Sequence, residues 1–214
     1  MSLTEKMIAN FKKLPTGNVG DANDKKGIMY HNIKPIDPAC HLVGLAVTVK
    51  CCPGDNLALH QGIYAAKAGD VLVFDIGGYS EAGHFGDIMA TACMVRGIAG
   101  VVMDGSCRDS LDMKSMGFPF FCTGFNPTGT IKNALAEINV PISCGGVIVN
   151  SGDLIVGDCD GVVVVPKDSI ASVYEKAMKI FNKEIEVRKQ LEAGMTTIEI
   201  YGLDKIIAEK TGKK

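Results

Sequence analysis

The sequence lacks three features that would suggest a membrane, exported or nucleic-acid-binding protein. No apolar run approaches the length of about 18 residues that a bilayer span needs. The first 13 residues mix charges with Ile8 and Phe11, so they lack the continuous apolar core of a signal peptide. Twenty-two Lys and Arg against 24 Asp and Glu give a formal net charge of −2, so no positive excess attracts nucleic acid or anionic lipid. We therefore expect a cytoplasmic protein whose partners are small molecules or further copies of itself.

The cysteine spacing typical of zinc sites is also absent. The eight cysteines are Cys40, Cys51, Cys52, Cys93, Cys107, Cys122, Cys144 and Cys159. They contain no Cys-x-x-Cys pair, and most of them lie inside apolar runs. This pattern predicts reduced thiols, most of them buried, rather than disulfides or zinc ligands. A chain of 214 residues with 47% hydrophobic residues can bury a core without such cross-links.

Strands and helices are expected to alternate through the first half of the chain. Apolar runs bounded by Gly and Pro predict strands, and apolar residues at helical spacing predict helices between them. The expected strands are 42–51, 71–76, 100–103 and 119–122, and the expected helices are 57–66, 88–96 and 109–116. Later, Gly-rich turns separate the apolar segments 147–149, 154–156 and 162–165, which is typical of antiparallel strands. The pattern predicts a layered, mixed α/β fold.

Helices are expected at both ends. An N-terminal helix over 1–14 should end at Pro15-Thr16-Gly17, before a loop that contains Asp21 and Asp24. From Asp168, apolar residues recur at helical spacing until Gly194, which predicts a long C-terminal helix. No repeat or linker divides the chain. We therefore expect one domain over 1–214, with a core of about 15–167 and a C-terminal helical segment of about 168–214.

Two short polar motifs follow neighbouring expected strands. Gly86-Asp87 ends a Gly-rich loop at the start of a helix, and Arg108-Asp109 occupies the same kind of position after the next strand. Side chains at the carboxyl ends of neighbouring strands converge on one crevice in α/β folds. Carboxylates suit Mg²⁺ or Mn²⁺, and the guanidinium fork matches a substrate carboxylate. The residues alone also allow a simpler interpretation, in which both aspartates cap helices and Arg108 forms a surface ion pair.

These motifs resemble the signature of the RraA-like, 4-hydroxy-4-methyl-2-oxoglutarate aldolase family. Gly86-Asp87, twenty residues and then Arg108-Asp109 match that signature with its spacing intact. The similarity runs from about Asp21 to the C-terminal helix, through segments 44–49, 53–56, 69–73, 100–105, 145–147, 152–158 and 161–166. The resemblance implies a swivelling β/β/α fold, assembly as a homotrimer or hexamer, an active site at the subunit interface and a divalent metal.

The same resemblance implies roles for individual residues. Asp109 would be the direct protein ligand of Mg²⁺ or Mn²⁺, and Arg108 would bind the pyruvyl end of a small 2-oxo acid. Asp87 would orient a metal-linked water for proton transfer. Together with Gly86, the backbone N–H groups of Ile88 and Met89 at the helix start would hold the substrate carboxylate.

Further candidates have weaker support. The family draws a glutamate from a neighbouring subunit, and Glu184 in the long C-terminal helix is the candidate here. His84 lies in the Gly-rich loop before Asp87 and could line the site or act as a base. Asp158 and Asp160 flank Cys159 in a turn between strands. Turn chemistry is the favoured explanation for that pair, and a second metal site is the alternative.

The reaction implied is that of a divalent-metal-dependent lyase. A class II aldolase of this kind would cleave 4-hydroxy-4-methyl-2-oxoglutarate, or a related 4-hydroxy-2-oxo acid, to pyruvate through an enolate, and oxaloacetate decarboxylation would use the same enolate. The alternative is an RraA-type regulator that binds an RNA-degrading endonuclease without catalysis. The joint presence of Asp87 and Asp109 favours the enzyme. A methyltransferase is disfavoured, because no Gly-rich cofactor loop follows the first strand.

Overall fold

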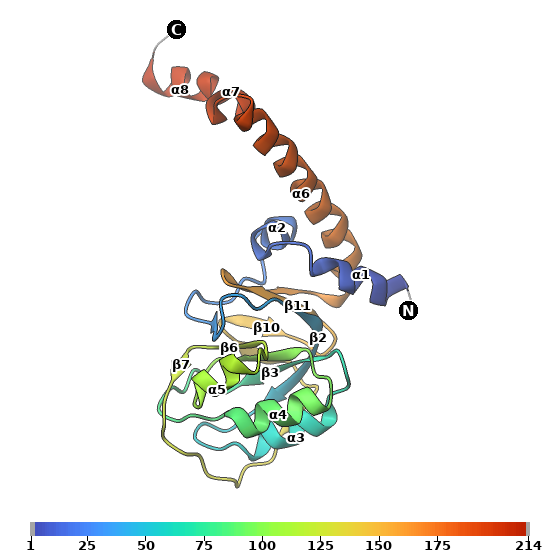
Figure 1. Ribbon diagram of the computed structural model, residues 1–214, viewed down its shortest axis with the longest axis vertical. Coiled ribbons are helices and arrows are strands. Elements are labelled where there is room, and N and C mark those ends of the chain that lie inside the picture. Colours follow the sequence, from blue (N-terminus) through green and yellow to red (C-terminus); the bar gives the residue numbers. More distant parts are fainter. Residues whose placement is uncertain (1–2, 213–214) are drawn as a thin grey trace.

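The computed structural model describes residues 3–212 and has a mixed α/β architecture (Figure 1). Its main sheet has eight strands, in the order β1-β6-β4-β3-β2-β11-β12, with β8 paired to β2. These strands are β1 (Lys34–Pro35), β2 (Leu42–Lys50), β3 (Val71–Asp75), β4 (Gly100–Met103), β6 (Phe120–Cys122), β8 (Glu137–Ile138), β11 (Leu154–Asp158) and β12 (Gly161–Val165). The expected mixed α/β class is confirmed.

The sheet combines a parallel half and an antiparallel half. Strands β2, β3, β4 and β6 run parallel, and most of their residues are buried. Parallel strands covered on both faces are continuous apolar runs, which is why the sequence pattern identifies them. Strand β2 joins the halves, since its first residues pair antiparallel with β11 and its later residues pair with β3. The strands expected after residue 150 are indeed antiparallel.

Three helices cover the lower face of the parallel half in Figure 1, namely α3 (Leu57–Ala65), α4 (Asp87–Val95) and α5 (Ser110–Ser115). Their buried side chains and those of the strands form one continuous apolar core. Helix α3 packs closely because Gly62 has no side chain, and a Cβ there would lie 2.8 Å from Cγ2 of Val49. A hairpin of β9 (Ile142–Cys144) and β10 (Val147–Val149) forms a separate small sheet, and β5 (Ser106–Cys107) pairs with β7 (Gly124–Phe125).

The N-terminal region differs from the sequence expectation. Helix α1 (Leu3–Phe11) lies within the expected helix, whose first two residues fall outside the described part of the chain. The prediction of a loop after Pro15 is wrong, because Thr16–Ala22 forms helix α2. Pro15 precedes its first residue, and the N–H and Oγ1 of Thr16 donate to the carboxylate of Asp158 at 2.8 and 2.7 Å. Helix α2 also packs beside α6, so tertiary contacts stabilise a segment with poor helical propensity.

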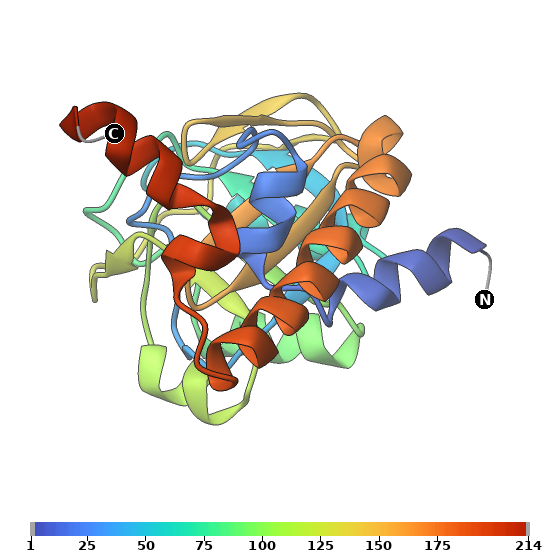
Figure 2. The same ribbon diagram turned by 90° about the horizontal axis from the view of Figure 1, so that it is seen from above.

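The expected long C-terminal helix is confirmed. A 3-10 turn, η1 (Lys167–Ser169), leads into α6 (Ile170–Glu192), which is followed by α7 (Thr197–Tyr201) and α8 (Leu203–Thr211). The first part of α6 packs with α1 and α2 over β11 and β12. The remainder extends away from the body and leads into α7 and α8 (Figure 1), and the view from above shows the chain changing direction after α6 (Figure 2). Apolar side chains stay exposed along this arm: Ile185, Leu191, Met195, Ile198, Tyr201, Ile206 and Ile207.

The cysteines are free thiols, as the sequence predicts. Cys93, Cys107, Cys122 and Cys144 are buried, whereas Cys52 and Cys159 are exposed. Between residues 3 and 212, no helix is both long enough and apolar enough to cross a membrane.

Candidate active site

The two signature motifs lie at the carboxyl ends of β3 and β4. The chain leaves β3, passes through a Gly-rich loop and enters α4 at Gly86-Asp87, with Gly86 in extended backbone as the N-cap. It leaves β4, forms β5 and turns at Arg108-Asp109 into α5. The start of α4 therefore directs the positive end of its dipole to the place where the second motif lies.

Both motifs line one pocket of about 260 Å³, which we call the cationic pocket. It brings together every predicted site residue except Glu184. The lining is Asn56, His60, Gly83, His84, Gly86, Asp87, Ile88, Met89, Arg108, Asp109 and Lys132.

Asp109 does not act as an ordinary helix cap. It is the N-cap residue of α5, yet its side chain makes no capping hydrogen bond. Its backbone is left-handed, with φ 54°, and a non-glycine residue in that region costs on the order of 1 kcal/mol or more. Such strain is typical of functional positions, and it leaves the carboxylate free to face the pocket. The simpler interpretation of Asp109 as a cap is thus not supported.

Gly86 lets the carboxylate of Asp109 approach the start of α4. A Cβ placed on Gly86 would lie 2.4 Å from Oδ2 of Asp109, which is far inside contact distance. Gly86 therefore contributes through the absence of a side chain.

Arg108 is anchored through its backbone, while its guanidinium remains partly exposed. Its N–H donates to the carbonyl of Phe85 at 2.9 Å, which ties the second motif to the loop before the first. Its Nε lies 3.5 Å from Oδ2 of Asp109, and Nη1 reaches within 3.9 Å of the Cβ position of Gly129. At this separation the ion pair is loose, so the guanidinium can bind a substrate carboxylate in its place.

The first turn of α4 offers two free amides, since neither the N–H of Asp87 nor that of Ile88 donates a hydrogen bond to a residue between 3 and 212. The N–H of Met89 donates to the carbonyl of Gly86 at 3.1 Å, so it is already engaged. The N–H of Ile88 has no partner among the hydrogen bonds of residues 3–212. Asp87 is the first residue of the helix, and its side chain is half-buried in the pocket wall. An anion at this helix start could accept from the free amides of Asp87 and Ile88.

His84 lies in the wall of the pocket and is only 1% exposed. Its Nε2 accepts a hydrogen bond from the N–H of Gly54 at 2.9 Å, and its carbonyl accepts one from Asn56. Burial lowers the pKa of His84, so the ring is neutral near pH 7. Because the Nε2 lone pair is occupied, this histidine is well placed to hold the 53–56 turn and poorly placed to accept a substrate proton.

Three further residues line the pocket: Asn56, His60 and Lys132. The sequence favours a pocket-lining role for the 53–56 turn and makes His60 a weaker candidate base than His84, but Lys132 was missed. Asn56 is the N-cap of α3 and His60 follows four residues later, so helical spacing places both on one face. Burial lowers the pKa of His60, and the charge of Lys132 lowers it further. Lys132 lies in an irregular segment that has no periodic pattern, so no local signal marks it.

Glu184 lies outside the pocket of its own chain. It is on the extending part of α6, where its carboxylate accepts from Arg188 at 3.2 Å, one helical turn away. Its predicted role concerned a neighbouring subunit and stays a prediction.

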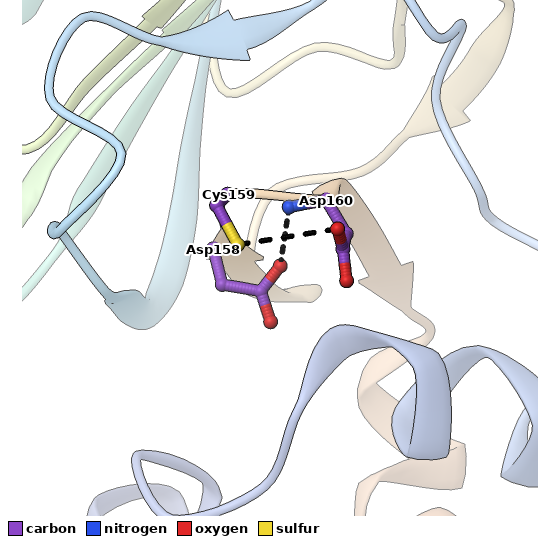
Figure 3. A group of neighbouring side chains, drawn as sticks. All are labelled: Asp158, Cys159 and Asp160. Carbon is purple, nitrogen blue, oxygen red and sulfur yellow. Dashed lines mark hydrogen bonds between the residues drawn. The ribbon is translucent and has the colours of Figure 1, made fainter.

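The Asp158-Cys159-Asp160 group is a β-turn cluster on the surface (Figure 3). Oδ1 of Asp158 accepts from the backbone N–H of Asp160 at 2.9 Å, and both Asp158 oxygens also accept from Thr16. Hydrogen bonds within the fold thus account for Asp158, as the turn interpretation expects.

A second, larger pocket of about 630 Å³ lies on the other side of the Gly-rich loop, and we call it the acidic pocket. Its lining is Tyr30, Asn32, Ile33, Asp75, Gly77, Gly78, Ser80, Asp104, Thr123, Ser143, Gly145 and Gly146. Asp104 is 8% exposed and accepts from the N–H of Ile76 at 2.6 Å, and burial raises its pKa to about 6. Asp75 accepts from the N–H of Gly77 at 3.0 Å. No motif or pattern in the sequence predicts this pocket.

Comparisons with known proteins agree with the geometry. A family model described as Aldolase/RraA matches residues 16–164. A protein of Halalkalibacterium halodurans named "Putative 4-hydroxy-4-methyl-2-oxoglutarate aldolase" is 39% identical over 200 residues, which cover 94% of this chain and 95% of that protein. The structure of an uncharacterized protein from Pseudomonas syringae pv. tomato aligns with a TM-score of 0.79 at 28% identity, over 90% of this chain and 94% of that one.

Another solved structure is Streptomyces coelicolor RraAS2, described as an unusual member of the RNase ES inhibitor RraA protein family. It aligns with a TM-score of 0.77 at 27% identity, over 86% of this chain and 98% of that one. The family model, the aldolase-named relative and these two folds lead to one conclusion. The chain belongs to the RraA-like family.

Proposed function

We propose that this chain is a divalent-metal-dependent lyase that cleaves a 4-hydroxy-2-oxo acid, such as 4-hydroxy-4-methyl-2-oxoglutarate, to release pyruvate. One observation carries the proposal: the uncapped carboxylate of Asp109 and the loosely paired guanidinium of Arg108 share a pocket with the start of α4. The carboxylate of Asp109 would bind a divalent metal, and the guanidinium of Arg108 and the start of α4 would bind the carboxylate of a 2-oxo acid.

The donor chemistry fits a hard cation. Asp109 offers an uncapped carboxylate, and Asp87 adds a second carboxylate to the same pocket. Oxygen ligands of this kind suit Mg²⁺ or Mn²⁺ rather than zinc, and none of the eight cysteines lines the pocket. The metal would be held by Asp109, and when bound it would supply a Lewis acid for the 2-keto oxygen.

The other residues of the pocket would bind the substrate, stabilise the enolate and assist proton transfer. Arg108 and the free amide of Ile88 bind the carboxylate of the pyruvyl unit and fix its orientation. A water in the pocket accepts the proton of the 4-hydroxyl, the bond between C3 and C4 breaks, and its electron pair forms the enolate of pyruvate. The charge of Arg108 stabilises that enolate, and Asp87 orients the water that returns a proton to C3. Oxaloacetate would lose CO₂ through the same enolate, so one site serves both reactions.

The exposed arm supports assembly of several copies. Helices α6, α7 and α8 extend away from the body (Figure 1), and seven of their large apolar side chains are exposed. Exposed apolar surface beyond scattered single residues is typical of an interface. We propose a homotrimer or hexamer in which this arm contacts a neighbouring copy and supplies Glu184 to its site.

The decisive experiment replaces Asp109 by Asn, since Asn tolerates left-handed backbone but carries no charge. Pyruvate release from 4-hydroxy-4-methyl-2-oxoglutarate and from oxaloacetate is measured with Mg²⁺ and with EDTA. We expect Asp109→Asn and EDTA each to lower the rate by about 100-fold or more. Asp112→Asn is the matched control, because Asp112 is an exposed residue in the first turn of the same helix, and it should keep full activity.

The alternative function is a protein-binding regulator. It is favoured by the similarity to Streptomyces coelicolor RraAS2, which is described as an unusual member of the RNase ES inhibitor RraA protein family. Absence of metal-dependent pyruvate release from either acid, together with inhibition of an RNA-degrading endonuclease, would replace the lyase proposal by this one.

A further inference from the structure

The cationic pocket needs a final acceptor for the proton of the 4-hydroxyl. The water that first takes this proton is a poor final acceptor, because a protonated water is a strong acid. Arg108 and Lys132 line the pocket as cations and have no lone pair to offer. Asp109 would hold the metal, and Asp87 orients the water that returns a proton to C3. The acceptor is then one of the two histidines of the pocket.

The two histidines differ in the state of their ring nitrogens. Nε2 of His84 accepts from the N–H of Gly54 at 2.9 Å, so Nδ1 of the neutral ring carries the proton and no lone pair is free. His60 is half-buried, and its ring takes no part in the hydrogen bonds found among residues 3–212. One nitrogen of its neutral ring therefore keeps a free lone pair. The structure thus reverses the order that the sequence gives these two candidates.

Helix α3 holds His60 at the pocket. The N–H of His60 donates to the carbonyl of Asn56 at 3.2 Å, and the side-chain amide of Asn56 donates to the carbonyl of His84 at 3.3 Å. Gln61, the next residue of the helix, accepts from the N–H of Ala136 at 2.8 Å. Helical side chains lean toward the N-terminus of their helix. His60 therefore lies over the first turn of α3, and hydrogen bonds fix the helix on both sides of it.

The pocket extends across the ends of three neighbouring strands. Helix α3 follows β2, α4 follows β3 and α5 follows β4, and these strands are adjacent in the order β4-β3-β2. Arg108 and Asp109 thus lie on the β4 side, the start of α4 lies in the middle, and His60 lies on the β2 side. A substrate with its pyruvyl carboxylate on Arg108 and the start of α4 would direct C4 and its hydroxyl toward His60.

The charges around the pocket keep His60 neutral. Burial lowers the pKa of His60, and the charge of Lys132 lowers it further. The other charged groups that share the pocket are Asp87 on α4, and Arg108 and Asp109 before α5. A histidine with a pKa below its ordinary value of about 6.5 is mostly unprotonated at pH 7. Its ring is therefore ready to accept a proton at that pH.

We propose that His60 is a catalytic base of the cleavage, which accepts the proton of the 4-hydroxyl through the pocket water. This inference rests on the proposed lyase function. The O–H bond of the 4-hydroxyl breaks, the C4–O bond becomes a carbonyl, and the electron pair of C3–C4 passes to the enolate. His60 then carries the proton as an imidazolium. The water that protonates C3 is left as hydroxide and receives the proton of His60, so the site returns to its starting state.

The test compares two reactions that share the enolate and differ in the hydroxyl. Cleavage of 4-hydroxy-4-methyl-2-oxoglutarate requires removal of the hydroxyl proton, whereas oxaloacetate loses CO₂ from a carboxylate that is already ionised. His60→Gln keeps a polar side chain of similar size but cannot accept a proton at pH 7. We expect kcat for the hydroxy acid to fall by about 100-fold or more, the range of a lost general base, and oxaloacetate decarboxylation to stay within about threefold. His31→Gln, which changes an exposed histidine outside the pocket, is the control.

Two further measurements separate a base from a residue that only packs or binds. Added imidazole should restore cleavage of the hydroxy acid by His60→Ala about 10-fold and leave its oxaloacetate reaction unchanged, since only a missing base is replaced in this way. Calorimetry with Mg²⁺ measures binding of 2-oxoglutarate, which lacks the 4-hydroxyl. We expect wild type and His60→Gln to bind it with equal affinity.

The outcomes distinguish this inference from the lyase proposal. An equal loss of both reactions in His60→Gln, a loss of affinity for 2-oxoglutarate, or undiminished cleavage of the hydroxy acid would each overturn the base role and leave the lyase intact. Absence of pyruvate release from either acid in the wild type would overturn the lyase proposal, and the role of His60 with it.

Discussion

Of the two pockets beside the Gly-rich loop, the acidic pocket has the larger volume, whereas the cationic pocket has more polar groups that are free to bind a ligand. The acidic pocket is the larger, at about 630 against 260 Å³, but its carboxylates already accept backbone hydrogen bonds, Asp104 from Ile76 and Asp75 from Gly77. In the cationic pocket Asp109 is uncapped, Arg108 is loosely paired and Lys132 has no ion-pair partner in the described chain. Polar groups that the fold itself does not use are therefore a better guide to the site than volume.

The two pockets also differ in the pKa of the buried aspartate beside each of them. Asp104 in the acidic pocket has a raised pKa, because burial outweighs the hydrogen bond from Ile76. Asp55 beside the cationic pocket has a lowered pKa, because three backbone donors outweigh burial. Asp104 holds the backbone of Ile76 just after β3, whereas Asp55 joins the start of α3 to Asn133 and Ala134. Substitutions on the two sides should consequently affect different properties of the protein.

The largest effect should come from Gly86→Ala. The added Cβ would lie 2.4 Å from Oδ2 of Asp109, so either the carboxylate or the start of α4 must move. We expect kcat/KM to fall by about 100- to 1000-fold, because a displacement of this size disrupts the aligned groups. The thermal midpoint should change little. Gly17→Ala is the control, since a Cβ there meets nothing within 4 Å. Near-normal activity in Gly86→Ala would refute the close approach.

The signature motifs were predictable because their geometry is local. Strand β4 lies where its apolar run placed it, and a turn that follows such a strand must emerge at the carboxyl edge of the sheet. Gly86-Asp87 and Arg108-Asp109 therefore meet without any knowledge of distant contacts. The strain at Asp109 was not predictable, since nothing in the sequence indicates a left-handed backbone at an aspartate.

Other features depended on contacts between residues distant in the sequence. Lys132 reaches the pocket through Asp55, almost 80 residues earlier in the chain. Helix α2 contains two glycines and gains its stability from Asp158 and α6, both more than 130 residues away. Local propensity gives no sign of either arrangement, so periodicity assigned a loop to α2 and left Lys132 unmarked.

Asp104→Asn should alter stability with pH while leaving activity largely intact. The folded pKa of Asp104, about 6, lies above its ordinary 3.8, so the folded state binds this proton more tightly. That stabilisation is complete below pH 3.8 and is lost as pH rises through 6. The contribution is at most about 3 kcal/mol. Asn keeps the acceptor for Ile76 without the charge. Denaturant unfolding at pH 4 to 8 should show a smaller decline in the variant than in wild type.

Activity of Asp104→Asn is the outcome that tests the comparison of the pockets. Pyruvate release measured at pH 7 to 8 should stay within about twofold of wild type, the variation expected where no reacting group is touched. A loss as large as that of Asp109→Asn would show that the acidic pocket takes part in the reaction. The distinction between the two pockets would then be wrong.

The smallest effect concerns where a divalent metal binds. A ligand present at ten times its dissociation constant stabilises the folded state by about 1.4 kcal/mol, which for a chain of this size raises the thermal midpoint by about 3 to 6 °C. We expect this shift with Mg²⁺ in wild type and in Asp160→Asn, which disrupts the surface Asp158-Cys159-Asp160 cluster without removing the Thr16 contacts of Asp158. Asp109→Asn should abolish it. The reverse result, a shift lost in Asp160→Asn and kept in Asp109→Asn, would move the metal to the β-turn and leave the cationic pocket with Arg108 and Lys132 as a site for anions alone.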